Sequence, residues 1–267
     1  MKKYFVIFLI LSVYHSFAQE KAYFSVLFND ATPLGNFKST NSINNSGFAS
    51  GGSAIDLSFN YNIHKHFGFA SMLREQITSF NSNGFAKTYA IDSIGTNNTY
   101  SYSGNMGGSY INVNLMGGAY YLIPFGKSEK FSIEARAMIG IQNSYRPDVS
   151  IQNNPPFSQY VFANPRIVLG ERQISYSHAN ALAFSYLVGL GCRYNLTHKV
   201  SLFVRVDYNA SNPSFKHITG TEVYTDHSGY NHTYASVQNY SIKMRSLNIG
   251  FGFGLRLFGK KEKIEKV

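Results

Sequence analysis

The chain has 267 residues and carries 24 Lys and Arg against 14 Asp and Glu, a formal net charge of +10 at pH 7. Charged residues make up only 14 % of it, well below the roughly 25 % of an average soluble domain, whereas aromatic residues make up 16 %. The single cysteine, Cys192, excludes an internal disulfide framework. No nucleic-acid-binding motif accompanies the positive charge, so we expect no nucleic-acid partner.

The first 18 residues are typical of a cleaved signal peptide. Lys2 and Lys3 precede the apolar stretch 4–14, which is too short to span a bilayer as a helix, and 16–18 places small residues where a signal peptidase cleaves. A buried amino-terminal core helix is the alternative. No cysteine follows the apolar stretch, which excludes a lipoprotein anchor. We therefore divide the chain into a signal peptide, a main domain and a charged tail, over residues 1–18, 19–258 and 259–267.

Beyond the signal peptide, eight segments alternate apolar and polar residues, which is the period of a β-strand with one apolar face. The last segment is the clearest: every odd-numbered residue from 247 to 257 is apolar, and the even-numbered ones are Asn, Gly or Arg. The segments cover residues 22–29, 55–63, 67–74, 111–121, 131–142, 182–194, 200–209 and 247–257.

Short and long connections alternate between these segments. A soluble β-sandwich could show the same strands, but tight turns at one end and long loops at the other are typical of transmembrane barrels. We therefore predict an all-β fold: an eight-stranded antiparallel up-and-down transmembrane β-barrel with four long extracellular loops and short periplasmic turns. The long loops are expected over roughly 32–48, 80–108, 145–179 and 211–244.

The ionisable residues of these strands fall almost entirely on the polar face. An Arg on the lipid face near the bilayer midplane costs about 2–4 kcal/mol, so the charged face should line a filled interior without a diffusion pore. Glu75 is the exception, which a bulge after Leu73 or a position above the hydrocarbon would explain. The predicted lumen charge network consists of Asp56, Arg74, Glu134, Arg136, Arg193, Arg205, Asp207 and Arg256.

Aromatic residues gather near the short turns, where the interfacial girdle of a membrane protein belongs. The generally favourable packing of aromatic residues in strands is the alternative explanation. The predicted girdle consists of Tyr61, Phe67, Tyr120, Tyr121, Phe125, Phe131 and Tyr194.

Two segments resemble the outer-membrane β-barrel domain proteins of the PorT-like and OmpX/OmpA-like kind. Residues 33–37, Pro-Leu-Gly-Asn-Phe, are similar to a Pro-Leu-Gly-Asp-Phe turn frequent in that family. Asn248, Gly250, Phe253 and Leu255 resemble the carboxy-terminal signal that the barrel assembly machinery reads, although the charged tail after them departs from the family pattern. The resemblance implies the bacterial outer membrane, with its lipids and the barrel assembly machinery as partners, and no particular activity.

The loops are rich in Tyr, Ser, Asn and Gly, the residue types that paratopes use for adaptable contacts. They predict a non-enzymatic protein with a surface interaction or envelope-structural role and an extracellular or envelope protein partner. One alternative is an outer-membrane lipid-modifying enzyme or protease that uses a loop histidine, for which His178, His227 and His232 are the candidates. Another, which only the family resemblance suggests, is an accessory component of a secretion assembly.

We expect no cofactor and no metal. His217, His227 and His232 lie in the last loop, but no cysteine or acidic cluster at ligand spacing accompanies them.

Overall fold

The computed structural model describes most of the chain after residue 21. The predicted signal peptide and charged tail lie outside the described residues. Among the described residues, no helix is long and apolar enough to cross a membrane. The described ranges are 22–42, 44–64, 66–94, 101–105, 108–125, 130–154, 172–225 and 230–258.

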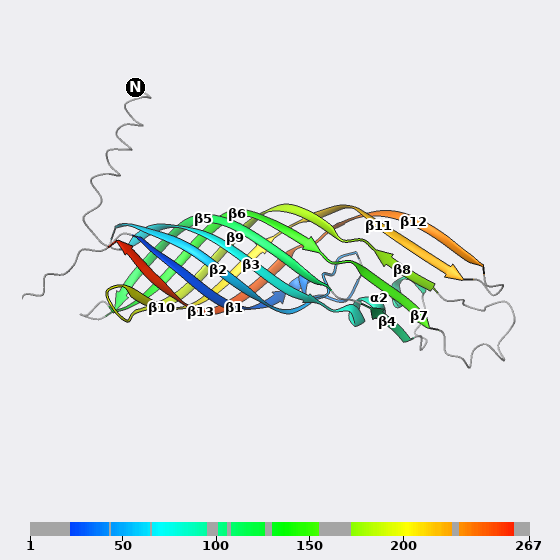
Figure 1. Cartoon of the computed structure of the whole chain (residues 1–267), viewed down its shortest axis with the longest axis horizontal. Helices are drawn as coiled ribbons and strands as arrows, with labels where there is room; N and C mark the ends of the chain where they lie inside the picture. The colour runs from blue at the N-terminus through cyan, green and yellow to red at the C-terminus, as the bar shows by residue number, and fades with distance from the viewer. Residues whose placement is uncertain are drawn as a thin grey trace, which may run out of the picture.

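Eight long strands form a closed antiparallel barrel, which confirms the predicted fold class. Each strand pairs with its neighbours among these eight, and the first closes on the last (Figure 1). All eight segments predicted from alternation lie within the observed strands, each of which extends further at one or both ends. The barrel strands are β1 (Ala22–Leu34), β2 (Ala49–His64), β3 (Phe67–Phe80), β5 (Ser109–Phe125), β6 (Phe131–Arg146), β9 (Ala179–Asn195), β10 (Val200–Ser211) and β13 (Met244–Phe258).

The strands are staggered as well as paired. A path of paired residues that leaves β1 at Leu34 and crosses to Arg245 on β13 passes every strand and returns to β1 at Phe24, ten residues earlier. Strand number and stagger together set the width of a barrel, and eight strands leave an interior that side chains can fill.

The two ends of the barrel differ. At the turn end, short connections join β2 to β3, β5 to β6 and β9 to β10, and here β1 begins and β13 ends. At the opposite end, which we call the loop end, the long connections contain further regular structure. These elements are η1 (Gly35–Phe37), α2 (Ser82–Ile94), β4 (Ser101–Asn105), β7 (Val149–Asn154), β8 (Arg172–Tyr176), β11 (Ser214–Thr225) and β12 (Asn231–Ser241).

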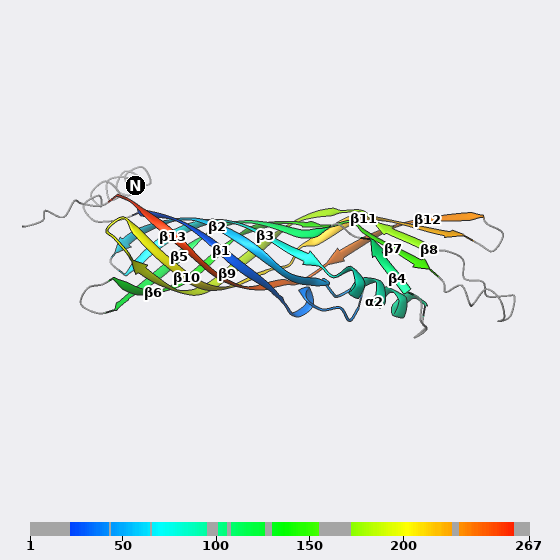
Figure 2. The same ribbon diagram turned by 60° about the horizontal axis from the view of Figure 1, so that its bottom comes forward.

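Five of these additional strands form a second sheet beyond the barrel. Its strand order is β12-β11-β8-β7-β4. Each of these strands directly precedes or follows a barrel strand in the chain, and those barrel strands have the same order, β13-β10-β9-β6-β5. We call this second sheet the extension sheet. It continues one part of the barrel wall past the loop end, whereas the part formed by β1, β2 and β3 leads into η1 and α2 (Figures 1 and 2).

Large apolar side chains cover the outside of every barrel strand. On β9 the belt runs from Tyr186 to Tyr194, with Leu190 63 % exposed midway between them. A soluble protein would rarely expose so continuous an apolar surface, whereas acyl chains cover such a belt on a membrane barrel. One exposed apolar residue from each strand, in the order of the chain, is Phe28, Leu57, Phe69, Leu115, Ile139, Leu190, Val204 and Phe251.

Two expectations about the faces need correction. Glu75 follows the alternation of β3 with no register shift around it, so the bulge is excluded and a position above the hydrocarbon stays the prediction. Tyr120, expected in the aromatic girdle, points into the lumen and is only 2 % exposed, whereas Tyr121 faces outward. Adjacent residues of a strand point to opposite faces, so Tyr120 and Tyr121 could not both belong to the girdle.

Replacing Leu190 by Arg should destabilise the barrel by about 2–4 kcal/mol, because the guanidinium would lie in the middle of the apolar belt. Val237→Arg is the matched control, since Val237 is 65 % exposed but lies on the extension sheet, where water solvates the new charge. Urea unfolding in phospholipid vesicles, followed by heat-modifiable gel mobility, measures both variants. Equal stability of the two would contradict a lipid-facing belt.

Candidate functional site

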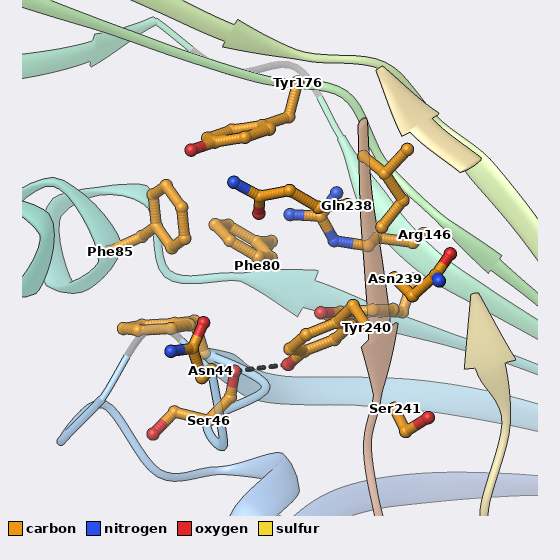
Figure 3. Close-up of a pocket in the computed structure, with 13 residues that line it drawn as sticks. Asn44, Ser46, Phe80, Phe85, Arg146, Tyr176, Gln238, Asn239, Tyr240 and Ser241 are labelled. Carbon is orange, nitrogen blue, oxygen red and sulfur yellow. Dashed lines mark hydrogen bonds between the residues drawn. The ribbon is translucent and has the colours of Figure 1, made fainter. Parts of the chain in front are cut away.

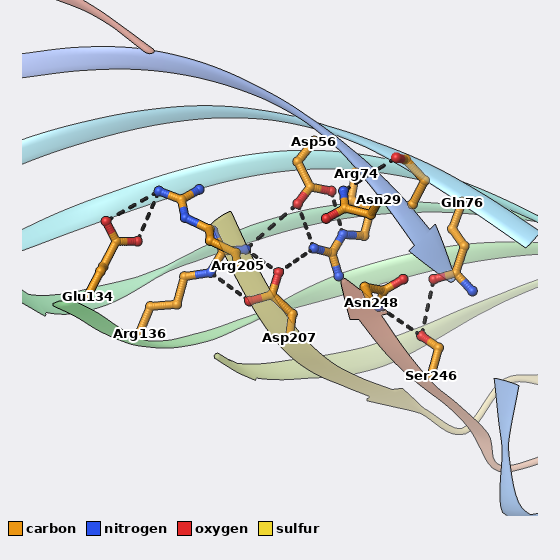
Figure 4. Close-up of polar contacts among 11 residues, drawn as sticks. Asn29, Asp56, Arg74, Gln76, Glu134, Arg136, Arg205, Asp207, Ser246 and Asn248 are labelled. Carbon is orange, nitrogen blue, oxygen red and sulfur yellow. Dashed lines mark hydrogen bonds and ion pairs between the residues drawn. The ribbon is translucent and has the colours of Figure 1, made fainter. Parts of the chain in front are cut away.

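The middle of the lumen holds six charged side chains in a four-residue cluster and a separate pair, which together we call the ionic network (Figure 4). Arg74 donates from Nε and Nη2 to the two oxygens of Asp56, both at 2.6 Å, and from Nη2 to Asp207 at 2.8 Å. Arg136 donates from Nε to Asp207 at 3.0 Å, and its Nη2 contacts the same carboxylate. Arg205 pairs with Glu134 at 2.9 Å. Three arginines thus face three carboxylates, so the charges of the network balance.

All six members of this network are almost completely buried, none more than 5 % exposed. Breaking one buried pair leaves an uncompensated charge, which is far more costly than losing an exposed pair. The side chains come from β2, β3, β6 and β10, so the network ties distant parts of the wall together across the lumen.

Two arginines predicted for the network lie outside it. Arg193 is buried near the turn end, where its guanidinium stacks on Tyr23 at 4.5 Å and its Nε donates to Asn195 at 3.0 Å. Arg256 lies still closer to the turn end and donates to the carbonyl oxygen of His198 at 3.4 Å. The polar face of a strand extends over its whole length, so sharing that face does not bring two residues to the same height in the barrel.

Glycines on β9 make room for the network. A Cβ on Gly191 would lie 2.7 Å from Cγ of Arg205, and one on Gly189 would collide with the carboxylate of Asp207. The polar face of β9 therefore offers bare backbone where its neighbour β10 carries long charged side chains.

Apolar side chains fill much of the remaining lumen, which the strand alternation did not reveal. Tyr23 stacks on Phe203 with ring centroids 5.7 Å apart and donates its hydroxyl hydrogen to Glu134 at 3.1 Å. The cluster consists of Tyr23, Leu27, Ala70, Met72, Met116, Tyr120, Leu122, Met138, Leu187 and Phe203. Together with the ionic network it occupies the interior.

The residues that resemble an assembly signal lie on both faces of β13. Asn248 and Gly250 are buried in the lumen, and Asn248 donates to Ser246 at 3.1 Å. Phe253 and Leu255 are 46 % and 47 % exposed on the apolar belt. Their role in assembly stays a prediction.

The loop histidines are not brought together with a nucleophile in the described part of the chain. His178 is exposed and stacks on Tyr145 with ring centroids 5.7 Å apart, while the hydroxyl of its neighbour Ser177 accepts a hydrogen bond from the Thr219 amide at 3.1 Å. His232 lies on the exposed strand β12, opposite Tyr224. His227 lies outside the described residues.

A cavity of about 150 Å³ opens at the loop end between the barrel rim and the extension sheet (Figure 3). We call it the loop-end cavity. Its cation is Arg146, the last residue of β6, and Asn44, Gln238 and Asn239 contribute amide groups. No sequence pattern marked it, because Arg146 follows the alternating part of its strand. Its aromatic lining consists of Phe48, Phe80, Phe85, Tyr110, Tyr176 and Tyr240.

Hydrogen bonds hold the segment before β2 against this cavity. Tyr110 donates from its hydroxyl to the Gly47 carbonyl oxygen at 2.9 Å, and Tyr240 donates in the same way to Ser46. Burial raises the pKa of Tyr240, and Tyr110 adds to the rise while Arg146 opposes it. The Tyr240 hydroxyl therefore stays protonated, and remains a donor, at neutral pH.

The closed sheet and its apolar belt decide the class of protein. The chain is a transmembrane β-barrel of the outer-membrane type. No protein-family model matches the sequence, and neither does any curated protein.

Solved structures similar to this one are also outer-membrane proteins. Neisserial surface protein A (NspA) has 10 % identity and a TM-score of 0.42, with 88 % of this chain and 97 % of that chain covered. Ail, the attachment invasion locus protein of Yersinia pestis, has 9 % identity and a TM-score of 0.41, with 88 % and 99 % covered. A major outer membrane protein from Thermus thermophilus has 13 % identity and a TM-score of 0.40, with 87 % and 99 % covered. Similarity at this level identifies no ligand or partner.

Replacing Asp207 by Asn should destabilise the barrel by about 3–5 kcal/mol, because Arg74 and Arg136 would lose the carboxylate that joins them. Asp30→Asn is the matched control: Asp30 is exposed on the outside of β1, and the change should stay within about 0.5 kcal/mol. Urea unfolding in vesicles measures both. A loss at Asp207 no larger than that at Asp30 would show that the network is not a structural element.

The filled lumen should carry no ions. We expect the purified protein in a planar lipid bilayer to stay at the baseline conductance, under conditions in which a general porin opens as the positive control. Stepwise conductance above the baseline would show that the side chains do not close the barrel.

Proposed function

We propose that the protein is a non-enzymatic outer-membrane barrel that binds a protein partner at the cell surface through the extension sheet. The observation that carries the proposal is the edge strand β12. Within the described residues it pairs only with β11, and every residue from Thr233 to Asn239 is exposed. One edge of this part of the strand is thus left for another chain.

An uncovered edge strand offers a row of backbone donors and acceptors to an added strand. Natural proteins protect such edges with Lys or Pro, and β12 contains neither. It carries Tyr234 and Val237, 61 % and 65 % exposed, which favour extended pairing and offer apolar contact. Strand addition by an extracellular or envelope protein would use all of these features.

The loop end faces outward in this proposal. The start of β1 and the end of β13, which both lie at the turn end, would then face the periplasm. This is the usual orientation of bacterial barrels. The extension sheet would project from the outer leaflet into the medium. The ring of His178 stacks on Tyr145 and the Ser177 hydroxyl accepts from the Thr219 amide, so neither contact pairs a base with a nucleophile, which supports a binding role over hydrolysis.

Proline substitutions at Ser236 and Val237 test the edge. Amides of adjacent strand residues point to opposite sides, so one of the two prolines removes a donor that faces β11 and the other removes a donor at the free edge. We expect the free-edge variant to lose the partner in crosslinking on intact cells while the extension sheet resists protease as in the unmodified protein.

Val237→Thr is the matched control, since it keeps both the β-branched shape and the backbone donor. It should retain the partner. Crosslinking that survives both proline variants would rule out strand addition at β12.

A further inference from the structure

Arg146 in the loop-end cavity is a buried cation that meets no carboxylate among the described residues. It is 7 % exposed, and its Nη1 atom has no hydrogen-bond partner. Its guanidinium carbon lies 5.5 Å from the centroid of the Tyr240 ring, and within the described parts of the chain it forms no ion pair with a carboxylate. In Figure 3 the guanidinium points toward Gln238 and the rings around the cavity.

Three of the four other buried arginines of the lumen differ from Arg146. Arg74, Arg136 and Arg205 each contact at least one carboxylate at 3.0 Å or less. The fourth, Arg193, stacks on Tyr23 and donates to Asn195. A buried charge without a carboxylate is costly, and among the described residues only the Tyr110 hydroxyl and the Tyr240 ring stand in for the lost hydration of Arg146. An anion in the cavity would supply the missing partner.

The size of the cavity limits this anion. A cavity of about 150 Å³ is large enough for one six-membered ring. A planar carboxylate matches the guanidinium, which can donate two parallel hydrogen bonds to it. Phe80, Phe85 and Tyr176 offer apolar ring faces beside this charge.

The cavity also offers hydrogen bonds to a ligand with hydroxyl groups. The amides of Asn44 and Gln238 can each donate and accept, whereas Asn239 already accepts from the His217 amide and Ser241 already donates to Ser214. An aromatic acid offers the amides of Asn44 and Gln238 no hydroxyl group, whereas a sugar ring does.

We propose that the loop-end cavity binds the carboxylate of a six-membered-ring acid, a sugar acid in preference to an aromatic acid, with Arg146 as the carboxylate-binding residue. The ligand enters from the loop end, because the ionic network and the apolar cluster around Tyr23 and Phe203 fill the lumen on the other side. The contacts and the burial that support this site do not rest on strand addition at β12, although Gln238 and Tyr240 of that strand line the cavity.

Titration calorimetry of the full-length protein in detergent micelles tests the site with three probes. Glucuronate should bind, glucose should bind at least about ten-fold more weakly for lack of the charge, and benzoate should bind more weakly than glucuronate for lack of hydroxyls. Arg146→Gln should weaken glucuronate binding at least about ten-fold. Arg245→Gln is the matched control and should bind glucuronate as the unmodified protein does, since Arg245 is exposed near the same end but does not line this cavity.

Gln238→Ala keeps the proposal testable if the Arg146 variant fails to fold, because Gln238 is exposed on β12. This change should weaken glucuronate binding and leave benzoate binding unchanged. Glucose binding as tight as glucuronate binding, or full affinity in Arg146→Gln, would overturn the carboxylate site. Benzoate binding tighter than glucuronate binding would overturn the preference for a sugar acid.

Discussion

The pairing of β1 with β13 is the constraint on which the other features depend. A bilayer offers no water to unpaired backbone groups, so a sheet can cross it only when its first and last strands close on each other. Closure at eight strands with a ten-residue stagger also determines which side chains face inward and how much space they share. The membrane, by requiring closure, therefore constrains which side chains the sequence can place in the lumen.

The lumen is filled by balanced charges that lie beside glycine residues of the wall. Arg74, Arg136 and Arg205 are long enough to reach across the lumen, and the carboxylates of Asp56, Glu134 and Asp207 meet them there. Glycines on neighbouring wall positions leave the necessary space. Because each of these pairs is buried and hydrogen-bonded, the network specifies one arrangement of the strands and closes the lumen at the same time. Both proposed binding surfaces accordingly lie at the loop end.

Strand alternation was sufficient to predict the barrel and the face of each ionisable residue, because the bilayer enforces the same rule on every strand. Alternation could not predict how far along the barrel axis each of these side chains lies. Arg193 and Arg256 share the polar face with Arg205 but lie closer to the turn end. Of the extension sheet, the sequence indicated only a hairpin of residues 221–225 with 230–234, which β11 and β12 form. The strands β4, β7 and β8 and the position of Arg146 escaped prediction, since the alternating pattern of β6 ends before Arg146 and these strands were counted as loops. Contacts there join residues far apart in the chain, as between Tyr240 and Ser46.

The two proposed binding surfaces share one strand. The free edge of β12 would receive a partner strand, while Gln238, Asn239 and Tyr240 of the same strand line the loop-end cavity. If both proposals hold, a strand added to β12 would hold these side chains in place before the acid arrives, and a bound acid would order β12 for its partner. Linkage requires the two effects to be equal in free energy. A barrel whose lumen is closed could in this way combine recognition of a surface protein with recognition of a small anion at one rim.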